Sequence, residues 1–313
     1  MNAVIEALRR QSLDVAQWEL LVVDNASTEN LTGWVDLPWH PHGRILREEK
    51  LGLTHARLRG IQETKSGVLV FVDDDNVLAQ DYLQVALDLA QDHPSLGIWS
   101  GRIELEFEAT PPDWTRKYWP FLVHRPVRRD EVSQELRLEE PLPVGAGLCV
   151  RREVASAYAS VAGSSRLRLG LGRCGVELGS SEDTDMVMFA CAHGWQRGVF
   201  KLLRLQHLIP PERVTEDYLV RLVEGIQFSS FVVKLLHQIN PVPPPINAWW
   251  RLKYMCDLAV KFGRKRRFYR AAKNAQRRSR KLYEELVLAA AKSVSSPESE
   301  VLVGVARDSN GSP

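Results

Sequence analysis

The apolar positions of the first hundred residues follow two alternating patterns. Nearly all-apolar runs that end in acidic residues, at 18–25 and 68–75, have the β-branched character of strands covered on both faces. Residues 2–11, 54–64 and 81–91 place apolar side chains three or four positions apart, which predicts helices. Because strand and helix patterns alternate, we expect an α/β fold with a mostly parallel sheet flanked by helices.

The pattern is less regular between residues 96 and 214. Residues 96–105 predict another strand, whereas 107–143 form a loose stretch without a clear period. A glycine-rich turn at 144–147 leads into a strand and a helix, and 180–193 predict a helix that ends at Gly194. A further strand is expected after this glycine.

From residue 215 the chain becomes helical. Residues 217–239 predict one helix, and prolines at 241–245 separate it from a long helix or a pair of helices. The final SSPESEVLVGVARDSNGSP is typical of a disordered tail. We expect three parts: an α/β domain at 1–214, a helical region at 215–295 and a disordered tail at 296–313.

The composition is that of an ordinary globular protein, with 44% hydrophobic and 26% charged residues among 313. No uninterrupted apolar run approaches the roughly 18 residues of a spanning helix, and the N-terminus lacks the apolar core of a signal peptide. The four cysteines have neither zinc-type spacing nor a paired framework, which favours a reducing compartment. We expect a cytoplasmic protein.

The charges are unevenly distributed. Residues 264–281 contain ten of the 41 Lys and Arg residues and no acid, which leaves 31 bases against 39 acids elsewhere. Such a segment can lie on an anionic membrane, which would make the protein peripheral at the inner face of the membrane. The alternative is a solvated helix face. No nucleic-acid recognition motif accompanies the charge, so no nucleic-acid partner is expected.

Three consecutive aspartates, Asp73, Asp74 and Asp75, follow a buried strand. Carboxylates this close repel one another, so the fold needs a cation to offset them, and a metal ion is the first candidate. Asp24 ends the preceding strand, and ligands of open α/β sheets bind beyond the carboxyl ends of the strands. Such carboxylates can bind a base or ribose and hold a divalent ion on phosphate oxygens. Alternatively they cap the following turns.

Three motifs occur in the order and spacing of a known family: LLVVDNAST, KLGLTHARLRGIQETKSGVLVFVDDDN and SSEDTDM. With them the chain resembles the family-2 glycosyltransferases of the GT-A fold over about residues 18–207. A lone D-x-D is a weak signal, but three ordered motifs are specific. The resemblance implies a Rossmann-like GT-A sheet, a nucleotide-sugar donor and transfer of the sugar to a hydroxyl acceptor.

The resemblance also implies roles in donor binding. Asp24 would contact the nucleobase, Arg57 would lie near the nucleotide pocket, and Asp73 would bind ribose. Asp74 occupies the variable middle position of the aspartate motif, and we group it with these residues. Leu58 departs from the family, which usually has asparagine at this position of the helix motif.

A metal site is implied in the same way. Asp75 would ligate Mn²⁺ or Mg²⁺ on the diphosphate, and related enzymes often have a histidine after the base-bearing helix that completes the site. His207 is the candidate for that histidine, because it follows the strand expected after Gly194. The structural interpretation is a histidine whose ring is satisfied within the core.

Glu182 and Asp183 begin the helix expected at 180–193, with Ser180 placed for a capping box. Capping is one interpretation of these acids. The resemblance implies another, in which Asp183 is the base of an inverting displacement and Glu182 supports it. A helix N-terminus favours the ionised carboxylate that such a base requires.

Two further groups have both a functional and a structural interpretation. The aromatic residues of the loose stretch can stack on an acceptor sugar or fill the edge of the core; they are Trp114, Tyr118 and Trp119. Gly145 and Gly147 can let the backbone approach the donor sugar or can simply form a tight turn.

The sequence thus predicts a metal-dependent, inverting glycosyltransferase of polysaccharide or glycan biosynthesis, with a glycan or other hydroxyl compound as acceptor. The first strand of the family's sheet should precede residue 1, so we expect the true start upstream. One alternative is a truncated, non-catalytic protein that binds a nucleotide or a partner. Another is a sugar-phosphate nucleotidyltransferase, although the sequence lacks its glycine-rich, basic phosphate loop.

Overall fold

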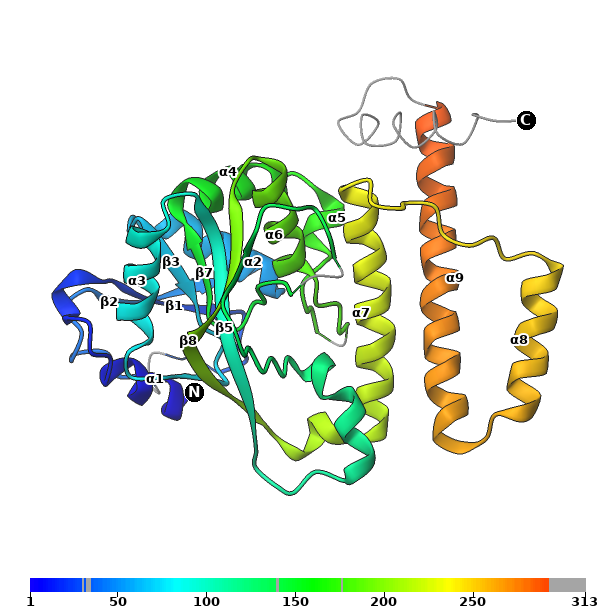
Figure 1. Cartoon of the computed structure of the whole chain (residues 1–313), viewed down its shortest axis with the longest axis horizontal. Coiled ribbons are helices and arrows are strands. Elements are labelled where there is room, and N and C mark those ends of the chain that lie inside the picture. The colour runs from blue at the N-terminus through cyan, green and yellow to red at the C-terminus, as the bar shows by residue number, and fades with distance from the viewer. Residues whose placement is uncertain (30, 32–34, 139–140, 176, 293–313) are drawn as a thin grey trace. The chain divides into compact units, whose positions relative to one another are not determined.

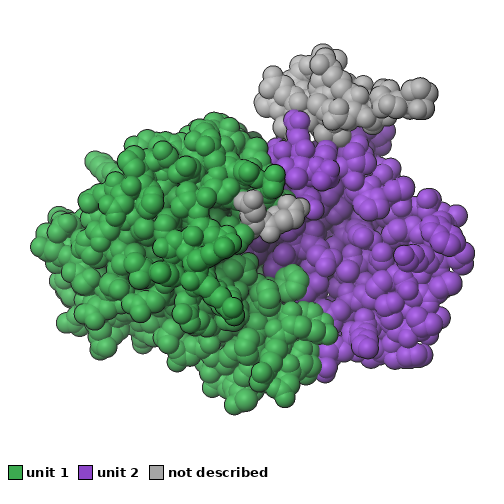
Figure 2. Space-filling model, viewed as in Figure 1, with its two compact units in different colours: residues 1–177, 182–214 green, residues 178–181, 215–313 purple. Residues whose placement is uncertain are grey.

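The computed structural model describes residues 1–29, 31, 35–138, 141–175 and 177–292. The chain divides into two compact units, which Figure 2 shows in green and purple. Unit 1 comprises residues 1–177 and 182–214, and unit 2 comprises residues 178–181 and those from 215 onward. The tail expected at 296–313 lies outside the described residues.

Unit 1 is a mixed α/β structure (Figure 1). Its strands are β1 (Leu20–Asn25), β2 (Gly43–Glu48), β3 (Val68–Phe71), β4 (Asn76–Leu78), β5 (Leu96–Phe107), β6 (Glu131–Ser133), β7 (Leu148–Arg151) and β8 (Gln196–Ile209). Its α-helices are α1 (Asn2–Arg9), α2 (Leu53–Glu63), α3 (Tyr82–Asp92), α4 (Arg152–Ala162), α5 (Arg166–Leu169) and α6 (Glu182–Ala192). The described residues of unit 1 also include the 3₁₀ helices η1 (Val15–Gln17), η3 (Asp113–Leu122) and η4 (Pro211–Val214).

The larger sheet has the strand order β3-β7-β5-β8-β4, and β6 pairs with β8 outside this path. Strands β5 and β8 are parallel, whereas β7 is antiparallel to both β3 and β5, and β4 and β6 are antiparallel to β8. Strands β1 and β2 form a separate parallel pair.

The α/β class with a helix-flanked sheet is confirmed, but the pairing is mixed rather than mostly parallel. A parallel crossover needs a dozen or more residues, and only four separate β3 from β4. Strand β4 therefore leaves β3 and pairs with β8. Strand β7 enters between β3 and β5 from the glycine turn and runs opposite to both.

Helices cover both faces of the larger sheet. Helix α3 packs against β8 and β3, α4 packs against β7 and β3, and α6 packs against β5 and β8. Figure 1 shows the strands between α3 on one side and α6 on the other. The residues of α6 from Met186 to Cys191 are apolar and buried, because this helix lies between the sheet and α4.

The core of unit 1 forms around the central strands. Strand β5 is buried from Leu96 to Gly101, and Trp99 and Ile103 are fully enclosed. Phe200 and Leu203 of β8 belong to the same cluster. Burying each large apolar side chain contributes about 1.5–3 kcal/mol. This packing fixes the strand ends that carry the predicted site residues.

Unit 2 consists mainly of α7 (Glu216–Leu236), α8 (Ala248–Val260) and α9 (Gly263–Lys292). Thr215 caps α7 through the N–H of Tyr218, and Asn247 caps α8 through the N–H of Trp250. Helices α7 and α9 pack together. Among the helices of the described ranges, none combines the length and the apolar character needed to cross a membrane.

Candidate active site

The predicted site residues of unit 1 fall into three groups. Asp73 lies with Arg57 and Glu182, Asp75 lies with His207, and Asp24 lies on the separate β1–β2 pair. Asp74 is exposed between Asp73 and Asp75. Asp183 adjoins the first group through the glycine turn, as its contacts show.

Arg57 is the centre of the first group. This residue of α2 is buried, and its Nη1 donates to Oε1 of Glu182 over 2.8 Å. Its Nη2 donates to Oδ1 of Asp73 over 3.2 Å and to the carbonyl of Gly145 over 3.4 Å. Burial opposes the charge, but Asp73, Glu182 and Asp183 raise the pKa of Arg57, so it stays cationic. One guanidinium thus links α2, the end of β3, the glycine turn and α6.

The glycine turn makes room for neighbouring side chains. A Cβ atom on Gly145 would lie 2.7 Å from Nη2 of Arg57, so any larger residue there would displace the guanidinium. Gly147 has a φ of +66°, and the hydroxyl of Tyr82 donates to its carbonyl over 2.7 Å. The geometry therefore explains both glycines by the turn itself and by the approach of Arg57 and Tyr82.

Two acids begin α6 with different surroundings. Glu182 is buried, and its Oε2 has no hydrogen-bond partner among the described residues. Asp183 is half-buried; its Oδ2 accepts from the N–H of Gly145 and its Oδ1 from the N–H of Thr184, both over 2.6 Å. Asp183 is therefore the more accessible of the two carboxylates at the N-terminus of α6.

The capping expected from Ser180 takes another form. The N–H of Ser180 and the hydroxyl of Ser181 bond to the hydroxyl of Ser229. The N–H of Thr184, in the first turn of α6, bonds to Asp183. Asp183 therefore has a capping contact of its own. This contact is compatible with a chemical role for the same carboxylate.

Burial raises the pKa of Glu182 above its ordinary value of 4.5; Arg57 opposes this shift, and Asp183 adds to it. The folded state then binds more protons than the unfolded state, so the free energy of unfolding falls as pH rises above 4.5. We expect wild type to lose stability relative to Glu182→Gln between about pH 5 and pH 8, measured by thermal unfolding. A constant difference across this range would contradict the raised pKa.

The second group lies where β4 pairs with β8, and its cation is Arg213. Asn76 is paired with His207 across these strands, so the preceding Asp75 lies near the histidine, with Oδ2 3.4 Å from Nε2. Nη1 of Arg213, in η4, donates to the same Oδ2 over 2.6 Å and lies 3.3 Å from Nε2. Burial opposes the shift, but His207 and Arg213 lower the pKa of Asp75 to about 2. Arg213 therefore offsets this carboxylate in the structure.

The donor set fits a divalent ion with two protein ligands. Nδ1 of His207 lies 2.9 Å from the carbonyl of Leu122, and a carbonyl only accepts, so Nδ1 carries the proton. In the neutral form of the ring Nε2 then carries no proton and can bind a metal, as in metal-binding histidines oriented by a carbonyl. Among the described residues no group of three or more His, Cys, Asp or Glu side chains could hold a metal. Any ion here would need other ligands and would displace Arg213.

Asp24, on the separate β1–β2 pair, has hydrogen-bond partners of its own. Its Oδ1 accepts from the N–H of Ser27 over 3.0 Å, and its Oδ2 accepts from Nη1 of Arg47 in β2 over 2.7 Å. Burial opposes the shift, but Ser27 and Arg47 lower the pKa of Asp24. Asp24 therefore stabilises the turn that follows β1, as the turn interpretation predicts. Its contact with a nucleobase stays a prediction.

Three residues near these groups were not anticipated. Arg47 and Arg213 offset Asp24 and Asp75, and Asp185 accepts from the hydroxyl of Tyr158 over 2.8 Å. The sequence predicts a cation beside the three aspartates and favours a metal ion, whereas the structure has Arg213 beside Asp75. Arg47 lies 23 residues from Asp24 along the chain, and Arg213 lies 138 residues from Asp75, so no local sequence pattern indicates either pair.

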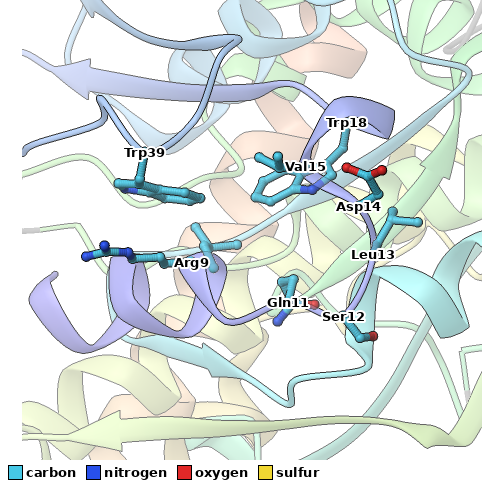
Figure 3. Close-up of a pocket in the computed structure, with 9 residues that line it drawn as sticks. Arg9, Gln11, Ser12, Leu13, Asp14, Val15, Trp18 and Trp39 are labelled. Atoms are coloured by element: carbon cyan, nitrogen blue, oxygen red, sulfur yellow. The ribbon is translucent and has the colours of Figure 1, made fainter.

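A cavity of about 340 Å³ lies elsewhere in unit 1. It lies beside Trp18, just before β1, and Asp24 lies near the other end of this strand. Figure 3 shows Trp18 and Trp39 on one side of the cavity and Arg9 and Gln11 on the other. None of the predicted site residues lines it, so it is separate from the three groups.

Three solved glycosyltransferase structures are among those to which the chain is similar. The mannosyltransferase PcManGT from Pyrobaculum calidifontis, in complex with GDP-Man and Mn²⁺, is 17% identical, with a TM-score of 0.50 over 100% of this chain and 77% of that one. TarS from S. aureus is 13% identical, with a TM-score of 0.46 over 93% and 82% of the two chains. GalNAc-T7 with UDP, GalNAc and Mn²⁺ is 16% identical, with a TM-score of 0.46 over 81% and 50%.

At these identities the likeness concerns the fold alone, and no curated protein matches the chain by sequence. The sequence profile described as glycosyl transferase family 2 matches residues 1–158 of the 313. The matched part contains Asp24, Arg57 and the three aspartates after β3. The chain therefore belongs to glycosyl transferase family 2, and it is a glycosyltransferase that uses a nucleotide-sugar donor.

Proposed function

We propose that residues 1–214 form the catalytic domain of a metal-dependent, inverting glycosyltransferase of polysaccharide or glycan biosynthesis. The observation that carries this proposal is the position of Asp183. Its half-buried carboxylate lies at the N-terminus of α6, held by the N–H of Gly145. The adjacent Glu182 is joined through Arg57 to Asp73, so the acids of α6 and β3 form one connected group.

In this proposal Asp183 accepts the proton of the acceptor hydroxyl. The hydroxyl oxygen forms a bond to the anomeric carbon of the sugar, the bond from that carbon to the diphosphate oxygen breaks, and a nucleoside diphosphate leaves. A single displacement of this kind inverts the anomeric carbon and needs one base. Backbone N–H groups fix the Asp183 carboxylate, so it is oriented before the acceptor binds.

The donor would lie along the strand ends. Asp73, oriented by Arg57, would accept from ribose hydroxyls, and Asp24 would contact the nucleobase. Asp75 and His207 would hold Mn²⁺ or Mg²⁺, with the protonated Nδ1 of His207 fixed on the carbonyl of Leu122. A divalent ion bound there would neutralise charge on the diphosphate leaving group.

The acceptor in this proposal is a glycan or another hydroxyl compound. The aromatic residues of η3 are the candidates for stacking on it, and the rings of Trp114 and Tyr118 form an edge-to-face pair. None of the four cysteines, all of which lie in the described residues, forms a disulfide, which supports a cytoplasmic location. Contact of residues 264–281 with an anionic membrane is a separate prediction.

Donor binding tests the metal site. Calorimetry of wild type with a nucleoside diphosphate should show affinity that rises when Mn²⁺ is added. Asp75→Ala should lose this dependence, because it removes one of two protein ligands, while the far-UV spectrum stays unchanged. Asp92→Ala is the matched control, since Asp92 is exposed at the end of α3, belongs to none of the three groups and should bind as wild type does. Equal metal dependence in Asp75→Ala and wild type would refute the site.

A further inference from the structure

Helix α8 of unit 2 exposes an apolar face. None of its residues is buried, and the apolar side chains at positions three to five residues apart lie on one side of the helix. Together with the residue just before α9 they are between 56% and 74% exposed: Trp249, Leu252, Met255, Val260 and Phe262. We call these five residues the α8 apolar face. An exposed apolar cluster of this size marks an interaction surface.

The opposite side of α8 is fixed to α9. The indole N–H of Trp250 donates to Gln276, and Tyr254 stacks on Tyr269 with ring centroids 6.0 Å apart. The guanidinium of Arg277 lies over the rings of both Trp250 and Tyr254. These contacts fix the rotation of α8, so the apolar face points away from α9.

Cations border the apolar face. On a helix of 3.6 residues per turn, Arg251 and Lys253 fall on its two edges, and both are exposed. The only acid of α8, Asp257, is held by Lys261 and by the hydroxyl of Tyr269. The first turns of α9 add three exposed cations and no acid: Lys265, Arg266 and Arg270.

Other charges of the basic segment have partners within unit 2. Arg264 and Arg267 pair with Glu216, Arg278 pairs with Glu224, and Arg280 pairs with Glu284. The membrane contact predicted for residues 264–281 therefore involves fewer of the cations in this segment. The cations considered for a partner are Arg251 and Lys253 at the edges of the α8 apolar face and the exposed Lys265, Arg266 and Arg270 of α9.

We propose that the α8 apolar face docks on the surface of an anionic membrane, together with Arg251 and Lys253 at its edges and the exposed cations of the first turns of α9. An apolar stripe with cations along its edges is the pattern of helices that lie in the lipid interface, with the charged ends at the headgroups. A second copy of the chain fits less well, because a symmetric contact would bring the same cations together. The docking needs neither donor nor turnover, so it is independent of the proposed chemistry.

Vesicle binding tests the proposal with the full chain. Wild type should sediment with vesicles of phosphatidylcholine and phosphatidylserine, and less with phosphatidylcholine alone. Raising the ionic strength from roughly 0.05 to 0.5 M should release it, because headgroup attraction is screened. Leu252→Glu combined with Met255→Glu should weaken partition by at least about tenfold, because two apolar contacts are replaced by charges that anionic lipid repels.

The matched control changes exposed leucines elsewhere. Leu202 and Leu288 are exposed to a similar extent, so Leu202→Glu combined with Leu288→Glu should bind vesicles within about twofold of wild type. Arg251→Gln combined with Lys253→Gln should weaken binding by roughly tenfold or more, since each cation near the surface contributes about 1 kcal/mol. Donor affinity should be unchanged in all three variants.

Three results would overturn the proposal. They are equal binding to neutral and anionic vesicles, undiminished binding of Leu252→Glu with Met255→Glu, and a wild-type dimer in light scattering that this variant converts to monomer. The last result would assign the face to a second copy of the chain. A failure of sugar transfer would leave these measurements unaffected, so the two proposals fail separately.

Discussion

Replacing Asp183 by asparagine is expected to lower sugar transfer to a saturating acceptor by about two to four orders of magnitude, the usual share of general-base catalysis. Asparagine has the volume of aspartate and can keep one of the two backbone hydrogen bonds from Gly145 and Thr184. It cannot take the proton of the hydroxyl. Donor affinity should persist, because the donor contacts proposed for Asp73 and Asp75 lie on other segments.

The measurement is single-turnover transfer together with calorimetry of donor binding. Asp81→Asn is a matched control, because Asp81 is the N-cap residue of another helix of unit 1, α3, and its partner is Arg204. This variant should transfer sugar as wild type does. Near-wild-type transfer by Asp183→Asn would mean that the base lies elsewhere and that Asp183 only caps α6.

The sequence predicts those strands and helices whose own pattern of apolar and polar residues is sufficient to identify them. The apolar run of β1, the apolar strand before the three aspartates and the helix after Ser181 each carry a local signal, and the structure has them at these positions. Strand β2 was not predicted, because GRILRE has only two strongly apolar residues and its stability comes from pairing with β1. Strand directions also depend on pairing, and no local pattern gives them.

The acids were found from sequence, but their partners were not. The sequence shows directly that acidic residues follow an apolar strand. Which cation lies beside them depends on the tertiary fold. Arg213 meets Asp75 only because β4 pairs with β8, which brings η4 to the aspartates. Arg57 was expected beside a nucleotide. Its burial between Asp73 and Glu182 needs four segments to converge, and no spacing within one motif contains that information.

Replacing Arg57 by methionine is expected to cost about 3–5 kcal/mol of unfolding free energy, the usual result of removing one partner from a buried ion pair. Methionine fills much of the space but leaves the Glu182 carboxylate buried without its cation, and Oε2 of Glu182 already has no partner among the described residues. Arg57→Lys should cost less, although one ammonium group cannot reproduce the separate contacts to Glu182 and Asp73.

Urea unfolding at neutral pH measures this effect, with Arg59→Met as the matched control. Arg59 lies two residues further along α2 and forms a half-exposed pair with Glu63 within this helix, so its loss should cost less than about 1 kcal/mol. Adding Glu182→Gln to Arg57→Met should recover part of the stability, because the variant then buries no unpaired carboxylate at that position. If Arg57→Met and Arg59→Met cost the same, the guanidinium does not hold Glu182 and Asp73 together.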